Sequence, residues 1–281
     1  MNKQLALLIG AAVVVTLIFF LGSTTKPQKL IDNNTASAGP SYNIDSILSA
    51  EQVKLTDTQQ IYINSRLESV KRGAVVADQV KNYKSLADYY SNELHQQDGY
   101  LFYLQKAAKL ENSEKSLTFA AQLFLGAVKV EHEPAKLAWL TNSSIDLFQS
   151  ALVKNPTNND LKIGLGSSYV YGKGQSADPQ ELMTGVAKLL EVVREDSTNM
   201  KAQLVLGVGG FVSTQYDKAV ERLLKVVAAQ PGNVEAVAFL ADSYAALGNK
   251  TEAVKWYEKS KSLIKNPDYD KEVDERIKQL K

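Results

Sequence analysis

The chain of 281 residues has no cysteine, only two histidines and no excess of charge of either sign. Without cysteine there can be no disulfide, no thiolate metal ligand and no cysteine nucleophile. Lysine and arginine total 32 and aspartate and glutamate total 31, so no net field attracts a phosphate backbone. The composition therefore argues against nucleic acid and against thiolate-bound metal as partners.

Motifs for catalysis and for cofactor binding are also lacking. His95 and His132 belong to no HExxH motif or other ligand cluster. The glycine-rich stretch 164–174 fails as a phosphate loop because a glycine, Gly174, follows Lys173 where Ser or Thr is needed, and because a helix precedes it. The stretch 206–211, LGVGGF, fails as a dinucleotide fingerprint for the same contextual reason. We expect no enzyme, no cofactor and no metal, and we interpret these glycines as helix-packing positions or turns.

The one long apolar run lies at the N-terminus. Residues 4–25 carry no charge, and at about 1.5 Å of rise per residue they are long enough to cross a hydrocarbon core of about 30 Å. We predict a transmembrane signal anchor at 1–25, followed by a flexible linker at 26–43 that is rich in small and polar residues. The alternative is a cleaved signal peptide, whose best small-x-small match is Ala36-Ser37-Ala38.

The flanking charges leave the orientation of this anchor open. Lys3 and the amino terminus on one side nearly balance Lys26 and Lys29 on the other. A short N-terminal stub usually stays in the cytoplasm, so we expect an extracytoplasmic, periplasmic body in the membrane-anchored protein. A cytoplasmic body is the alternative.

Residues 44–281 show the periodicity of helices. Apolar residues recur at spacings of three and four, as in 61–70 and 80–90, without a sustained period of two. A packing pattern also repeats: the small pair Ala241 and Ala253 returns 34 residues earlier as Gly207 and Ala219. On two antiparallel helices, small residues at these places let the backbones approach closely.

These residues resemble the tetratricopeptide repeat, a helix-turn-helix unit of 34 residues. The tryptophan position of that motif holds Lys162, Gln203 and Val237 here, so the signature is incomplete. The whole chain also resembles a group of uncharacterised bacterial proteins with one N-terminal span and a repeat body. The resemblance implies an all-α solenoid of helical hairpins with an N-terminal transmembrane helix and, at 268–281, a capping helix. The repeats are clearest at 160–198, 200–233 and 234–267, and degenerate at 82–159.

The same resemblance implies a binding groove on the first helix of each hairpin, where extended peptides or partner helices dock. Carried over by position, the groove residues are Ile163, Ser167, Val170, Tyr171, Lys201, Leu204, Val208, Phe211, Val212, Ala238 and Asp242, with Asp160, Glu235 and Ala245 completing the set. Most are apolar, which favours an apolar peptide or helix. The alternative is that these residues pack on neighbouring helices, or that the N-terminal helices fill the groove.

The sequence thus predicts a membrane-anchored, non-enzymatic scaffold or adaptor with a protein or peptide partner. Three alternatives stay open: an ancillary role in assembling or translocating envelope proteins, an enzyme whose site lies in the irregular region 45–133, and homo-oligomerisation through the groove.

Overall fold

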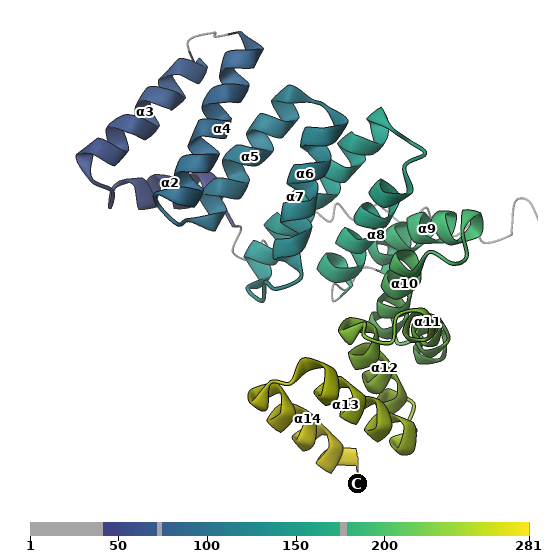
Figure 1. The fold of residues 1–281 in the computed structure, drawn as a ribbon. Coiled ribbons are helices and arrows are strands. Elements are labelled where there is room, and N and C mark those ends of the chain that lie inside the picture. Colours follow the sequence, from purple (N-terminus) through teal and green to yellow (C-terminus); the bar gives the residue numbers. More distant parts are fainter. Residues whose placement is uncertain (1–41, 72–74, 175–178, 281) are drawn as a thin grey trace, which may run out of the picture. The chain divides into compact units, whose positions relative to one another are not determined.

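The computed structural model describes residues 42–71, 75–174 and 179–280, and thirteen α-helices make up the regular structure of these residues (Figure 1). The predicted all-α fold is confirmed. The predicted anchor at 1–25 and nearly all of the linker at 26–43 lie outside the described residues. Within the described ranges, no helix combines the length and apolar character that a membrane span requires.

The helices follow one another as antiparallel hairpins. Five hairpins pair α4 with α5, α6 with α7, α8 with α9, α10 with α11, and α12 with α13. The helices are α2 Ile44–Gln52, α3 Asp57–Lys71, α4 Val76–Asn92, α5 Gln97–Glu111, α6 Glu114–Val128, α7 Pro134–Lys154, α8 Asn159–Lys173, α9 Pro179–Glu195, α10 Met200–Val212, α11 Tyr216–Ala229, α12 Val234–Ala246, α13 Lys250–Ile264 and α14 Pro267–Leu280.

Asparagine sets the start of the first helix in the last three hairpins. The side chains of Asn158, Asn199 and Asn233 cap α8, α10 and α12 by accepting hydrogen bonds from backbone N–H groups in the first turn. Each such cap satisfies a donor that the helix leaves unpaired and is worth about 1 kcal/mol. An asparagine cap therefore fixes the start of the first helix in each of these three hairpins.

Glycine and alanine set how closely the two helices of a hairpin approach. A Cβ added to Gly207 would lie 2.7 Å from Leu223, and one added to Gly210 would lie 3.1 Å from the backbone nitrogen of Ala219. Ala241 and Ala253 are fully buried in the following hairpin. The predicted packing role of these small positions is confirmed, although Gly210 and not Gly207 makes the close contact with Ala219.

The last helix, α14, covers the end of the final hairpin. Val273 and Ile277 are buried against α12 and α13, in a cluster with Ala241, Ala253 and Tyr257. Charged residues occupy the other faces of α14, as a terminal repeat requires for solubility. This is the arrangement expected of a capping helix.

The first helices α4, α6, α8, α10 and α12 together form what we call the first-helix surface. Along it, α6 packs directly on α8, α8 on α10 and α10 on α12. In the described residues α4 and α6 have no comparable contact, because α5 lies between them. Successive first helices therefore touch from α6 to α12, whereas α4 and α6 are separated.

Candidate protein-binding surface

Four of the predicted groove residues are buried. Ile163, Ser167, Val170 and Val208 are between 0% and 7% exposed, and three of them belong to the core cluster that joins α8, α9 and α10. The glycines of α8 and α10 allow these helices to pack tightly enough to cover them. In this structure these four side chains contact neighbouring helices instead of facing solvent.

Apart from Val208, the apolar groove residues of α10 and α12 are half-buried. Leu204, Phe211, Val212 and Ala238 all fall in this class. The Phe211 ring meets the Phe239 ring edge-on with centroids 5.4 Å apart. An aromatic contact of this geometry adds about 0.5–1.5 kcal/mol to the burial of the rings, so it ties α10 to α12.

The charged groove residues Lys201 and Asp242 both have partners. The Lys201 ammonium lies 3.2 Å from the Asp160 carboxylate at an exposed position, where such a pair contributes little. The Asp242 carboxylate accepts hydrogen bonds from the Tyr257 hydroxyl at 2.5 Å and from the Arg276 guanidinium at 2.8 Å. Asp242 therefore joins α12 to α13 and to the capping helix.

Tyr171 connects three first helices. Its hydroxyl donates a hydrogen bond of 2.6 Å to the Glu235 carboxylate at the start of α12. The ammonium of Lys129, at the end of α6, lies 4.1 Å from the centre of the Tyr171 ring and 3.3 Å from the same carboxylate. Burial, then the neighbouring Glu235 charge, raises the pKa of the Tyr171 hydroxyl. Tyr171 thus stays a neutral donor, and this group of three, which we call the α6–α8–α12 tie, occupies the predicted groove.

A binding role for the predicted groove residues stays a prediction. Their contacts are those of the alternative in which the same residues pack on neighbouring helices. They describe a first-helix surface on which α6, α8, α10 and α12 are linked to one another by side-chain contacts.

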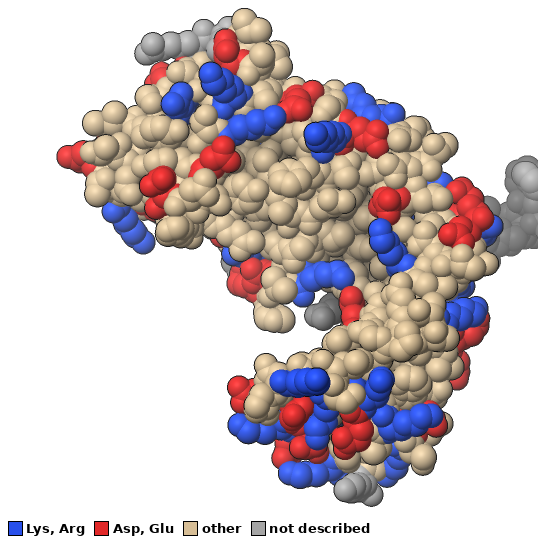
Figure 2. All heavy atoms as spheres, in the orientation of Figure 1, with Lys and Arg blue, Asp and Glu red and all other residues tan. Residues whose placement is uncertain are grey.

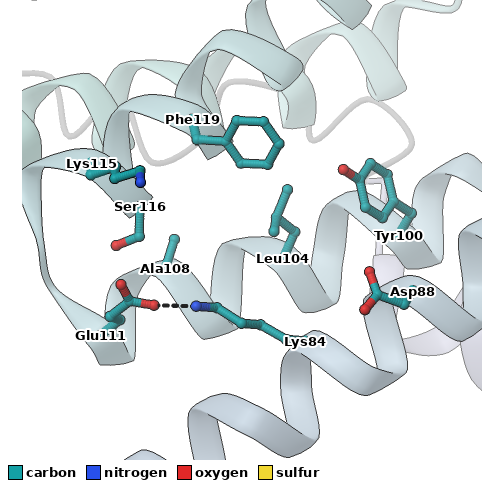
Figure 3. Close-up of a pocket in the computed structure, with 9 residues that line it drawn as sticks. All are labelled: Lys84, Asp88, Tyr100, Leu104, Ala108, Glu111, Lys115, Ser116 and Phe119. Atoms are coloured by element: carbon teal, nitrogen blue, oxygen red, sulfur yellow. Dashed lines mark hydrogen bonds and ion pairs between the residues drawn. The ribbon is translucent and has the colours of Figure 1, made fainter.

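The first-helix surface is hollowed upstream, between α4 and α6. A hollow of about 440 Å³ has α5 as its floor and α4 and α6 as its walls (Figure 3). Tyr100, Leu104 and Ala108 form the floor, and Phe119 extends over it from α6. Phe119 is 52% exposed, which is unusual for a phenylalanine beside an apolar floor. We call this hollow the α4–α6 cleft.

Charged side chains of both signs rim the α4–α6 cleft. Lys84 and Glu111 form an ion pair of 2.5 Å at one end, and the hydrogen bond from Lys84 lowers the pKa of the Glu111 carboxyl. Lys115 adds a cation near that end, whereas Asp88 lies beside Tyr100 (Figure 3). More widely, acidic and basic side chains are intermixed over the face shown in Figure 2. The cleft therefore offers an apolar centre with opposite charges at its two ends.

Sequence reasoning missed this cleft because it placed the groove in the clearest repeats. A signal was present: Phe119 lies off the apolar stripe of α6, which carries the buried residues Leu117, Ala121, Phe124 and Val128. An aromatic residue outside such a stripe must face solvent or a partner.

A polar cluster joins α5 and α7 to the start of the described chain, in the region considered for an enzyme site. The Tyr42 hydroxyl donates to Asp98, and Lys136 pairs with Asp98 at 2.9 Å and with Glu131 at 3.4 Å. The Tyr42 ring stacks on Trp139 at 5.3 Å. None of these residues lines the α4–α6 cleft, and no metal-binding group of His, Cys, Asp and Glu occurs in the described ranges. The cluster holds Tyr42, at the start of the described residues, against α5 and α7.

Comparisons with known proteins identify the fold. The TPR protein TTC0263 of Thermus thermophilus matches with a TM-score of 0.51 and 19% identity, over 72% of this chain and 98% of that one. MamA of Desulfovibrio magneticus RS-1 matches with a TM-score of 0.45 and 17% identity, over 76% and 98%. YrrB, described as a TPR protein with an unusual peptide-binding site, gives 0.45 and 16%, over 72% and 98%.

The sequence comparisons cover a smaller part of the chain. Residues 200–281, less than half of the chain, match the family model for regulator of microtubule dynamics protein 1-3. No curated protein matches the chain. The likeness to the Thermus protein shows that the chain has a TPR-like helical repeat fold, and this likeness extends to the fold alone.

Proposed function

We propose that this protein is a non-enzymatic scaffold that binds a segment of a partner protein on its first-helix surface, with the α4–α6 cleft as the principal docking site. The observation that carries the proposal is the exposed Phe119 ring above the apolar floor formed by Leu104 and Ala108. Helical repeats of this kind use such surfaces to hold peptides or partner helices.

The size and chemistry of the α4–α6 cleft support a peptide occupant. At about 440 Å³ it accepts a few side chains of a peptide but does not enclose a small molecule, since its walls are open. A bulky apolar side chain fits between Phe119 and Leu104, and each 100 Å² of apolar area buried there contributes about 2.5 kcal/mol before the costs of association. Asp88 and Lys115 orient a segment that carries a base near one end and an acid near the other.

We further propose that residues 1–25 anchor this scaffold in a membrane, with the repeat body on the extracytoplasmic side. The support for the anchor is the uncharged run of residues 4–25, which is long enough to cross a hydrocarbon core. In this arrangement the scaffold holds its partner close to the bilayer.

Photo-crosslinking in intact cells tests the docking site. A benzophenone amino acid placed at Phe119 is expected to capture one defined partner, whereas the same probe at Val153 on α7, which is 77% exposed, is not. In protein without the photo-crosslinker, Phe119→Asp is expected to reduce recovery of that partner at least about tenfold, which corresponds to a loss of about 1.4 kcal/mol of binding free energy. The control variant Val153→Asp is expected to leave recovery unchanged. Equal capture at both positions would remove the α4–α6 cleft from the proposal. The identity of the partner also separates a general adaptor from an ancillary factor for envelope protein assembly.

Membrane fractionation tests the anchor independently. We expect the full chain to stay in the membrane pellet after alkaline extraction and a chain beginning at Tyr42 to be soluble. Protease added to spheroplasts is expected to degrade the body of the full chain; protection from protease would place the body in the cytoplasm. Release of the full chain by alkali would contradict the anchor.

A further inference from the structure

The hairpins have a second opening on the other side of the first helices. Between α9 and α11, a trough of about 330 Å³ has α10 as its floor. We call it the α9–α11 trough. It uses none of the residues of the α4–α6 cleft, so it is independent of the function proposed above.

The α9 wall of the trough is apolar. Leu182, Val186 and Leu190 follow one another at every fourth residue, which places them in a single line along the helix. From the first to the last, this line spans about 12 Å at about 1.5 Å of rise per residue. Met183 stands beside it and is 52% exposed. An unbranched thioether of this kind adapts to different apolar partners.

The α11 wall is cationic. Lys218 and Arg222 line it, and no carboxylate is among the described residues that line the trough. Each cation bonds to a neutral amide oxygen: the Lys218 ammonium to Gln215 at 2.6 Å, and the Arg222 guanidinium to Gln203 at 2.8 Å. Neither forms an ion pair within the described part of the chain, in contrast to Lys225 on the same helix, which pairs with Glu221 at 2.8 Å.

The floor of the trough is formed by α10 and the residue that follows it. Leu206, Gly209, Gly210 and Ser213 of this segment line the floor, and the two glycines add no side chain to it. Gly210 is needed for packing as well, since its Cβ would lie 3.1 Å from the backbone nitrogen of Ala219. The trough is thus apolar on one side and positive on the other.

We propose that the α9–α11 trough binds an amphipathic acidic segment of a partner protein, with apolar side chains against α9 and carboxylates against Lys218 and Arg222. An apolar line of about 12 Å matches two turns of a helix with apolar residues at every third or fourth position. The unneutralised cations supply the charge complementarity, which fixes the orientation of the segment and speeds its association. The protein therefore has two docking surfaces, one on each side of its first helices.

Selection from a displayed library of random 16-residue peptides tests this proposal on the full-length protein in detergent. Phage that bind the unmodified protein are eluted, and the recovered peptides are measured by fluorescence anisotropy against the unmodified protein and each variant. The expected binders are acidic on one helical face and apolar on the other. Their affinity is expected to fall at least about tenfold in Lys218→Glu and, separately, in Met183→Asp.

Matched variants make the result specific. Lys225→Glu lies on α11 outside the trough, and Val153→Asp exposes the same new charge as Met183→Asp on a distant helix. Both are expected to bind the peptides as the unmodified protein does. Phe119→Asp is also expected to have no effect, so a failure of the α4–α6 cleft and a failure of the trough are distinguished.

Three outcomes would overturn the proposal. The first is recovery of binders without an acidic excess, and the second is binding that survives both Lys218→Glu and Met183→Asp. The third is a dimer in sedimentation analysis that Met183→Asp dissociates, since that would assign the trough to a second copy of this chain.

Discussion

Gly164 and Gly126 are both helical glycines, but only Gly126 has room for a side chain. A Cβ on Gly164 would lie 2.3 Å from the Phe148 ring, whereas one on Gly126 would have no atom within 4 Å. Gly164→Ala is expected to destabilise the protein by about 1–3 kcal/mol through overpacking. Gly126→Ala is expected to stabilise it by about 0.5–1 kcal/mol through helix propensity. Urea unfolding followed by circular dichroism checks both, and a stabilising Gly164→Ala would contradict the packing role.

The hydroxyl of Tyr171 provides a second test at this scale. Tyr171→Phe keeps the ring on Lys129 but removes the hydrogen bond to Glu235. Because the acceptor is charged, the loss of stability is expected to be about 1.5–3 kcal/mol. Tyr244→Phe is the matched control, since the Tyr244 hydroxyl has no hydrogen-bond partner in the described ranges, and it is expected to change stability little. Equal effects of the two variants in urea unfolding would show that the α6–α8–α12 tie contributes nothing.

Residue roles were predictable where they depend on local spacing. The small positions at Ala241, Ala253 and Gly207 follow from the period of the repeat, because that period fixes which residues of a hairpin face each other. The contact of Tyr171 with Glu235 was not predictable, although both residues belonged to the predicted groove. Whether two groove residues face a ligand or each other depends on the angle between successive hairpins, and this angle is the sum of many small packing differences.

The helix α14 lies at the end of the repeat and packs on one neighbouring hairpin only. Ile277→Ala is expected to cost about 2 kcal/mol, at the low end for a buried isoleucine, since a terminal helix can adjust around the cavity. Hydrogen exchange followed by mass spectrometry is expected to show faster exchange in α13 and α14 and unchanged exchange in α4–α7. Gln279→Ala on the exposed face is the control. Uniform acceleration along the whole chain would contradict a purely local capping role.

The pairing of helices could be predicted even where the repeat is degenerate. The sequence predicts degenerate helical repeats at 82–159, and α4 to α7 of this region pair as two hairpins. Periodicity sufficed because hairpin partners are adjacent in sequence. The α4–α6 cleft was not predictable, since it arises from a missing contact between two helices that are not adjacent in sequence.

For the molecule as a whole, the structure predicts where the repeat body begins. A chain that starts at Tyr42 is expected to unfold cooperatively. A chain that starts at Ile44 lacks the Tyr42 contacts with Asp98 and Trp139 and the Asn43 cap of α2, so its stability is expected to be lower by about 1–3 kcal/mol. Thermal unfolding of the two chains checks this. Equal melting temperatures would show that Tyr42 and Asn43 contribute nothing.

The Tyr42 contacts also determine how a pull on the N-terminal segment is distributed. Tension on the chain before Tyr42 first shears the ring off Trp139 and stretches the bond to Asp98, which lie on α7 and α5. While these contacts hold, the force enters the body through two hairpins at once and bypasses the short helix α2. If a tether and a bound partner pull in opposite directions, this junction is the first part of the molecule to yield, and Trp139→Ala is the change that would lower its rupture force.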